Sequence, residues 1–157
     1  MVNISIPIYY GGNNPKGETW RETFLKEIKK KSILERIHFL GFIPYRAYLS
    51  VLKLSACHVY LTVPFILSWS FLEAATIGIP IVASDTPPVK EFSSRIKGLN
   101  LVNFFDENAI AEKVLEIIEN PVERTPNYLS EIDIKNTVPQ NYLCFVWTGE
   151  KRGRKKK

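Results

Sequence analysis

The sequence has few of the residues that build disulfide frameworks and metal sites. It contains two cysteines, Cys57 and Cys144, and two histidines. It has no Cys-x-x-Cys pair, and its histidines do not have the spacing of zinc ligands. These absences exclude a disulfide-stapled or zinc-stabilised fold, and they predict a reducing compartment and no bound metal.

Long apolar runs are also lacking. No run approaches the roughly 20 residues that a membrane-spanning helix needs. Residues 1–7 lack the basic region and apolar core of a signal peptide. We therefore predict a cytoplasmic protein.

The body of the chain carries no excess charge of either sign. The net charge is +5, and the six bases and one acid of residues 150–157 account for all of it. A nucleic-acid-binding domain normally carries a basic face in its body, so we expect no specific nucleic-acid partner. We predict a disordered basic tail over residues 150–157, with weak peripheral contact to anionic membranes, or weak attraction to nucleic acid, as its functional alternative.

The residues that are present suit one soluble domain. The chain has 157 residues, of which 45% are hydrophobic and 24% charged. Strand-like and helix-like segments alternate, which predicts an α/β fold with a mostly parallel sheet and helices on both faces. We assign residues 1–149 to this single domain.

The expected strands cover residues 4–10, 37–40, 58–63, 79–83 and 99–105. The expected helices cover residues 18–31, the apolar face of 45–52, and residues 71–77, which Gly78 ends as a C-cap residue. A further helix follows Asp106, which caps it, and another is expected within 128–145. Ligands of such sheets bind beyond the carboxyl ends of the strands. The loops of interest therefore follow Tyr10, Leu40, Val63, Ala83 and Phe105.

The loop after Val63 leads through Ser68, Trp69 and Ser70 into an expected helix. The first turn of a helix has unpaired N–H groups and partial positive charge, which favour a phosphate. The two serine hydroxyls add donors there, although capping the helix is an equal explanation for either serine. Trp69 is expected either to pack on a ligand or to fill the core.

Glu73 follows one turn later among apolar neighbours. A buried carboxylate is costly unless it is hydrogen-bonded. Glu73 would be well placed to accept hydrogen bonds from two adjacent sugar hydroxyls, such as those of a ribose. The alternative is a structural ion pair.

These segments resemble a known family. Residues 70–85 (SFLEAATIGIPIVASD), followed by Glu91, are similar to the C-terminal, donor-binding domain of family 4 glycosyltransferases of the GT-B fold. Residues 37–43 (IHFLGFI) and 56–61 (ACHVYL) match the same family's pattern upstream. The resemblance covers roughly residues 4–120 and implies a Rossmann-like domain.

The resemblance implies retaining transfer of a glycosyl group, with hexosyl expected, from a nucleotide-sugar donor to an unknown acceptor. In this family pattern, Glu73 corresponds to the acid that binds the ribose, and Ser68, Trp69 and Ser70 to the loop against the diphosphate. Leu67, Phe65 and Gly12 are weaker candidates for nucleotide binding. The resemblance also implies that no metal or other cofactor is needed, and it assigns no catalytic residue.

Two departures from the family pattern limit this reading. Phe65 stands where the family usually has a second glutamate, on the donor-sugar side. A GT-B enzyme also has an N-terminal acceptor-binding domain, for which this chain has no room. The sequence therefore predicts a donor domain that works with a missing N-terminal domain. The alternative is an inactive nucleotide-binding or protein-interaction module.

Overall fold

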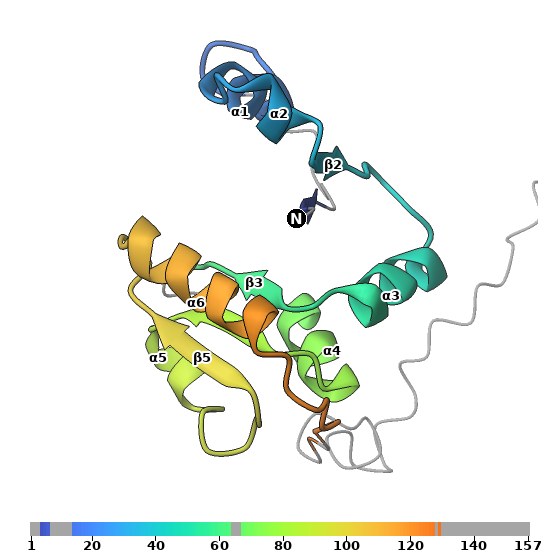
Figure 1. The fold of residues 1–157 in the computed structure, drawn as a ribbon, viewed down its shortest axis with the longest axis vertical. Helices are drawn as coiled ribbons and strands as arrows, with labels where there is room; N and C mark the ends of the chain where they lie inside the picture. Colours follow the sequence, from blue (N-terminus) through green and yellow to red (C-terminus); the bar gives the residue numbers. More distant parts are fainter. Residues whose placement is uncertain (1–3, 7–13, 64–66, 128, 130–157) are drawn as a thin grey trace, which may run out of the picture.

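The computed structural model describes residues 4–6, 14–63, 67–127 and 129, in which short strands and helices alternate (Figure 1). In chain order the elements are β1 (Ile4–Ile6), α1 (Trp20–Glu27), α2 (Lys31–Leu34), β2 (Ile37–Phe39), α3 (Tyr45–Leu54), β3 (His58–Tyr60), α4 (Trp69–Ile77), β4 (Ile81–Ser84), α5 (Pro87–Lys90), β5 (Leu99–Val102) and α6 (Glu107–Glu119). All the paired strands run parallel. The predicted α/β class is confirmed.

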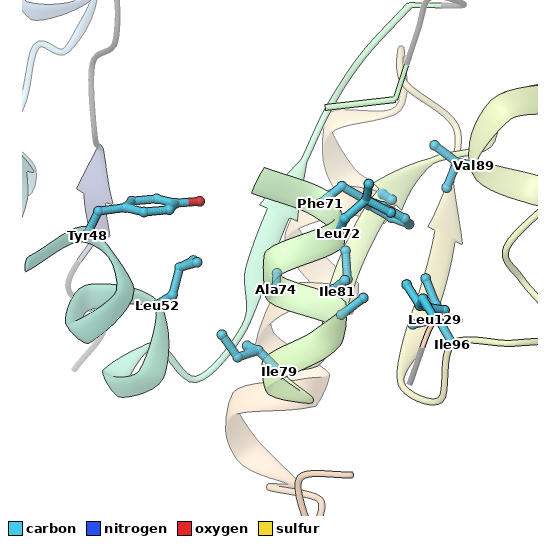
Figure 2. Packing of buried hydrophobic residues seen from close by; sticks show 12 residues of the cluster. Tyr48, Leu52, Phe71, Leu72, Ala74, Ile79, Ile81, Val89, Ile96 and Leu129 are labelled. Atoms are coloured by element: carbon cyan, nitrogen blue, oxygen red, sulfur yellow. The ribbon is translucent and has the colours of Figure 1, made fainter. Parts of the chain in front are cut away.

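A three-stranded sheet in the order β3-β4-β5 forms the centre of the domain. All four residues of its middle strand, β4, are buried. A strand that is covered on both faces does not alternate polar and apolar residues, and the sequence of β4 lacks that alternation. Helices α4 and α6 both pack against β4, and the two figures show them on opposite sides of it (Figures 1 and 2). Helices thus flank a parallel sheet, as in a Rossmann-like domain.

The first two strands form a sheet of their own. β1 pairs with β2 in parallel, with Ile4 opposite Ile37 and Ile6 opposite Phe39. Figure 1 shows this pair with α1 and α2 at one end of the molecule, joined to α3 by an extended segment. The parallel strands are therefore divided between two sheets, a division that the sequence did not indicate.

The helix predicted over residues 18–31 is wrong in its extent, because the chain forms two helices there. Thr19 and Glu22 form a capping box, with Glu22 N 3.2 Å from Thr19 Oγ1 and Thr19 N 2.9 Å from Glu22 Oε2. This box starts α1 at Trp20. The helix ends at Glu27, because the backbone of the C-cap residue Ile28 is extended (φ −83°, ψ 100°), and α2 begins at Lys31.

Helix α4 lies at the centre of the hydrophobic core (Figure 2). Its residues Phe71, Leu72, Ala74 and Ala75 are buried, so the helix is apolar on several sides. The ring of Phe71 is fully buried and lies 5.2 Å from that of Tyr60, between ring centroids. Burying one such side chain contributes about 2 kcal/mol to stability.

The chain returns to the end of α4 after α6. Asn127 Nδ2 donates to the Ala75 carbonyl at 2.8 Å, and Asn127 Oδ1 accepts from Lys97 N at 2.9 Å. Gly78 ends α4 with φ +81°, as predicted for a C-cap glycine. A Cβ at Gly78 would lie 2.5 Å from the backbone carbon of Thr125. This close approach and the left-handed backbone both require glycine.

Arg124 ties the same returning segment to α3. Its Nη1 donates to the Lys53 carbonyl, and its Nη2 donates to the Ser55 carbonyl at 2.9 Å. Both carbonyls belong to the end of α3, where helix carbonyls lack partners and a cation is favourable. Beyond this segment Leu129 is buried. The helix predicted within 128–145 and the basic tail otherwise lie outside the described residues.

Gly78→Ala should destabilise the protein more than Gly17→Ala. Both glycines have a φ near +80°, but nothing lies within 4 Å of a Cβ at Gly17. Gly17→Ala should cost about 1–2 kcal/mol for the left-handed backbone alone. Gly78→Ala adds a backbone clash, and we expect a loss greater by at least about 1 kcal/mol in urea unfolding. Equal losses would show that the Thr125 contact imposes no constraint.

His58 should make the protein less stable at acidic pH. His58 Nε2 is buried without a hydrogen-bond partner among the described residues. Burial lowers the pKa of His58 below its usual 6.5. Below about pH 6.5 the unfolded chain therefore binds a proton at His58 more readily than the folded chain does, so the free energy of unfolding decreases as the pH is lowered through that range. In urea unfolding, His58→Gln should lose less stability than the unaltered protein when the pH is lowered from about 7.5 to 5. An equal loss in the two proteins would assign the effect to other groups.

Candidate functional site

Two serine hydroxyls meet at the start of α4. The helix begins at Trp69, two residues before the predicted start, because Ser68 takes the N-cap position with extended backbone. The Ser68 side chain does not cap the helix; its Oγ lies 2.6 Å from Ser70 Oγ. Ser68 N donates to the hydroxyl of Tyr60 at 3.1 Å, which anchors the loop to β3.

This arrangement suits an anion. The nine residues of α4 align their peptide dipoles and place partial positive charge at Ser68–Ser70. Trp69 is 70% exposed, so of the two alternatives it does not fill the core. Leu67, in contrast, packs against the hydrophobic core. Leu67 therefore positions the loop from the inside, while Trp69 faces solvent.

Glu73 lies one turn further along α4 and is half-buried rather than enclosed. Its Oε1 accepts a hydrogen bond from the Tyr45 hydroxyl at 2.8 Å. Among the described residues the partner is thus a tyrosine of α3 and not a cation, so the expected alternative of an ion pair does not hold there. The second oxygen of the carboxylate keeps its capacity to accept further hydrogen bonds.

The facing sides of α3 and α4 form a groove with a volume of about 340 Å³. Its lining residues are Tyr45, Leu49 and Lys53 from α3, and Trp69, Leu72, Glu73, Thr76 and Ile77 from α4. Apolar walls with few polar groups are typical of small-molecule sites. An aromatic side chain, a carboxylate and an ammonium group in one groove can hold a planar ring beside hydroxyl groups.

Sequence reasoning missed the α3 side of this groove. It placed Tyr45 and Leu49 on an apolar helix face, which predicts burial, whereas Tyr45 is 56% exposed and both residues line the groove. Tyr45 lies 28 positions before Glu73, so no local pattern connects the two. The one available signal was a tyrosine at the amino end of an amphipathic helix.

A second cavity of about 380 Å³ lies at the carboxyl ends of β3, β4 and β5. It is lined by Thr62, Val63, Asp85, Thr86, Asn103, Phe104 and Phe105. The buried Thr86 Oγ1 has no hydrogen-bond partner among the described residues, while Asp85 pairs with Lys90 at 2.9 Å. This cavity lies beside the loops after Val63, Ala83 and Phe105, where a ligand is expected because ligands of such sheets bind beyond the carboxyl ends of the strands.

Two predicted site residues, Phe65 and Gly12, lie outside the described residues. In the part of the chain that the structure describes, no group of three or more His, Cys, Asp or Glu side chains is arranged to hold a metal ion. None of the helices described there has the length and apolar character needed to cross a membrane.

The family model described as glycosyl transferases group 1 matches residues 10–135. The chain belongs to this family. The match spans both cavities, the start of α4 and Glu73. No curated protein matches the chain, and no solved structure does. Membership supports glycosyl transfer in general, from a nucleotide-sugar donor.

Tyr45→Phe tests how much the hydroxyl bond to Glu73 contributes to folding. The pair is partly exposed, so its loss should cost about 1 kcal/mol or less in urea unfolding. Tyr45→Ala also removes a ring that lies 6.2 Å from the Tyr48 ring, and should cost more. A loss above about 2 kcal/mol for Tyr45→Phe would contradict this, and would mean that the bond holds the groove together.

Proposed function

We propose that this glycosyltransferase domain binds the nucleotide part of a nucleotide-sugar donor in the groove between α3 and α4. The observation that carries the proposal is the half-buried Glu73 carboxylate, held by Tyr45 in a groove with aromatic and aliphatic walls. In this assignment Glu73 accepts hydrogen bonds from the two ribose hydroxyls. The exposed ring of Trp69 and the aliphatic side chain of Leu49 offer surfaces for the base.

The diphosphate lies at the start of α4 in this proposal. The helix N-terminus and the hydroxyls of Ser68 and Ser70 stabilise its negative charge, which grows as the sugar leaves. Preformed donors of this kind can act without a metal ion. We accordingly propose metal-independent transfer with retention, by a cytoplasmic enzyme that uses a hexosyl donor.

The acceptor belongs to another domain in this proposal. The resemblance to the C-terminal domain of family 4 enzymes supports a GT-B arrangement, in which an N-terminal domain binds the acceptor. The exposed side chains of Trp69 and Phe105, at the groove and the second cavity, are consistent with a neighbouring domain there.

Glu73→Ala should abolish or strongly weaken the binding of UDP or GDP. The carboxylate is the acceptor for the ribose hydroxyls, and leaving them unpaired costs about 1–3 kcal/mol, or roughly 5- to 150-fold in affinity. The measurement is a thermal-shift titration, in which ligand at 100 times its dissociation constant adds about 2.7 kcal/mol of stability.

The matched control is Glu119→Ala, which removes an exposed carboxylate at the end of α6. It should leave nucleotide binding unchanged. If Glu73→Ala binds UDP or GDP as well as the unaltered protein does, Glu73 is not in the site. If neither nucleotide binds the unaltered protein, the groove is not a nucleotide site.

The second candidate is a module that binds a nucleotide without transferring a sugar. Phe65 favours it, since the acid expected at that position is absent. A transfer assay with several donors, with and without an N-terminal half supplied separately, distinguishes the two. Nucleotide binding without transfer in either arm supports the inactive module.

A further inference from the structure

The second cavity is built on the joined ends of three strands. Thr62 N donates to the buried Ser84 Oγ at 2.8 Å, which ties the segment after β3 to the end of β4. Asp85 N donates to the Val102 carbonyl at 2.8 Å, which ties the segment after β4 to the end of β5. Side chains on such fixed elements are held precisely, and a volume of about 380 Å³ is in the range of small-molecule sites.

The polar side chains of this cavity combine hydrogen-bond donors with acceptors. Asn103 Oδ1 accepts from Phe105 N at 3.0 Å, so the Asn103 NH₂ group keeps its two donors for a ligand. The Thr62 hydroxyl donates to the carbonyl of the following residue at 2.9 Å, which leaves its oxygen able to accept. Asp85 Oδ1 pairs with Lys90 at 2.9 Å, and the other carboxylate oxygen keeps its capacity to accept. Mixed donors and acceptors suit hydroxyl groups, because each hydroxyl is both.

Thr86 contributes a hydroxyl that the described part of the fold does not use. The residue lines the cavity and is 6% exposed, and its Oγ1 has no hydrogen-bond partner among the described residues. It occupies the N-cap position of α5, yet its side chain does not cap that helix. Buried hydroxyls without a partner are rare in folded proteins. A ligand in the cavity offers this hydroxyl a partner once its side chain rotates about the Cα–Cβ bond.

Charge and shape favour a neutral ring as the ligand. Lys90 balances the charge of Asp85, so the cavity attracts neither a metal ion nor an anion strongly. Phe105 is 84% exposed, and its ring meets that of Phe104 edge to face at 5.0 Å between centroids. An exposed aromatic ring presents a flat apolar surface. The cavity therefore fits a ring that has apolar faces and hydroxyl groups around its edge.

We propose that the second cavity binds a neutral sugar ring. Asp85, Thr86 and Asn103 form hydrogen bonds with its hydroxyl groups, and Phe105 covers one of its apolar faces. The ion pair of Asp85 is partly exposed and contributes little to stability, so the carboxylate is available to the sugar at small cost.

Two sources supply such a ring. The start of α4 lies at the same edge of the sheet as the cavity, since Ser68 N donates to the hydroxyl of Tyr60, the last residue of β3, at 3.1 Å. The glycosyl group of a donor whose diphosphate lies at that start is one source, and this version rests on the proposed function. A separate sugar molecule is the other source, and it does not depend on nucleotide binding.

An NMR titration tests the site directly. The probes are methyl α-glucoside and methyl α-mannoside, added up to about 100 mM to the ¹⁵N-labelled protein. The backbone amide signals of Thr62, Asn103 and Phe105 should shift and saturate, with a dissociation constant of about 10 mM or lower, while those of α1 stay unchanged.

Nucleotide sugars distinguish the two sources. If the donor supplies the ring, UDP-glucose or GDP-mannose shifts the same three amides, and UDP or GDP alone does not. If a separate sugar supplies it, a methyl glycoside shifts them even when a nucleotide sugar is already bound. Failure of every glycoside and nucleotide sugar to shift these amides overturns the proposal, even where UDP or GDP binds the groove. Glycoside binding without nucleotide binding supports the sugar site and contradicts the proposed function instead.

Thr86→Val and Asp85→Asn separate a ligand-binding role from a structural one. Thr86→Val removes a hydroxyl without a described partner, so stability in urea unfolding should stay the same or rise, while sugar binding weakens about fivefold. Asp85→Asn keeps the shape of the side chain and should weaken binding about tenfold or more, since it removes a charged acceptor. A stability loss with unchanged binding in Thr86→Val, or undiminished binding in Asp85→Asn, overturns the assignment.

Glu112→Gln is the matched control, because it neutralises an exposed acid on α6 outside the cavity. It should leave sugar binding unchanged, and an equal loss in this variant would show that Asp85 acts only through net charge. Phe105→Ala is a further variant that keeps the fold, since the ring is exposed. It should weaken binding of both methyl glycosides, and unaltered binding would remove the aromatic surface from the site.

Discussion

The burial of α4 against β4 is the contact on which the rest of the domain depends. Phe71, Ala74 and Ala75 have no exposed surface, and they face a strand that is itself fully buried. A helix fixed so firmly can hold its remaining positions with little freedom. Glu73 shares a turn with those core residues, and Ser68 and Ser70 lie at the helix start, so the packing that stabilises the fold also sets the geometry of the proposed site.

The sequence predicted best where a pattern is local. The apolar run of β4, the glycine at the end of α4 and the Asp106 cap of α6, whose Oδ1 accepts from Ala109 N at 2.9 Å, each depend on a few consecutive residues. The break between α1 and α2 was missed because the apolar periodicity continues through Ile28 although its backbone leaves the helix. Periodicity reports which face is buried, and it reports helix ends poorly.

The candidate site was predicted only on its α4 side. Serines before a helix and an acid inside an apolar run are visible in one segment of sequence, whereas the groove exists because α3 packs beside that segment. The hydrogen-bond partner of Glu73, Tyr45, lies 28 positions away in the sequence, so only tertiary packing brings the two together. The same limit applies to the sheets, since strand sequences indicate parallel pairing but not which neighbours are present.

The contacts of Arg124 and Asn127 make the segment after α6 part of the groove's construction. Arg124 holds the end of α3, and Asn127 holds the end of α4, so both walls are fastened at their far ends by one short stretch of chain. That stretch has no regular secondary structure, so its sequence resembles a linker that could be omitted. A shortened version of this domain that stops at the end of α6 would keep every described helix and strand and still lose the brace that sets the spacing of the two walls.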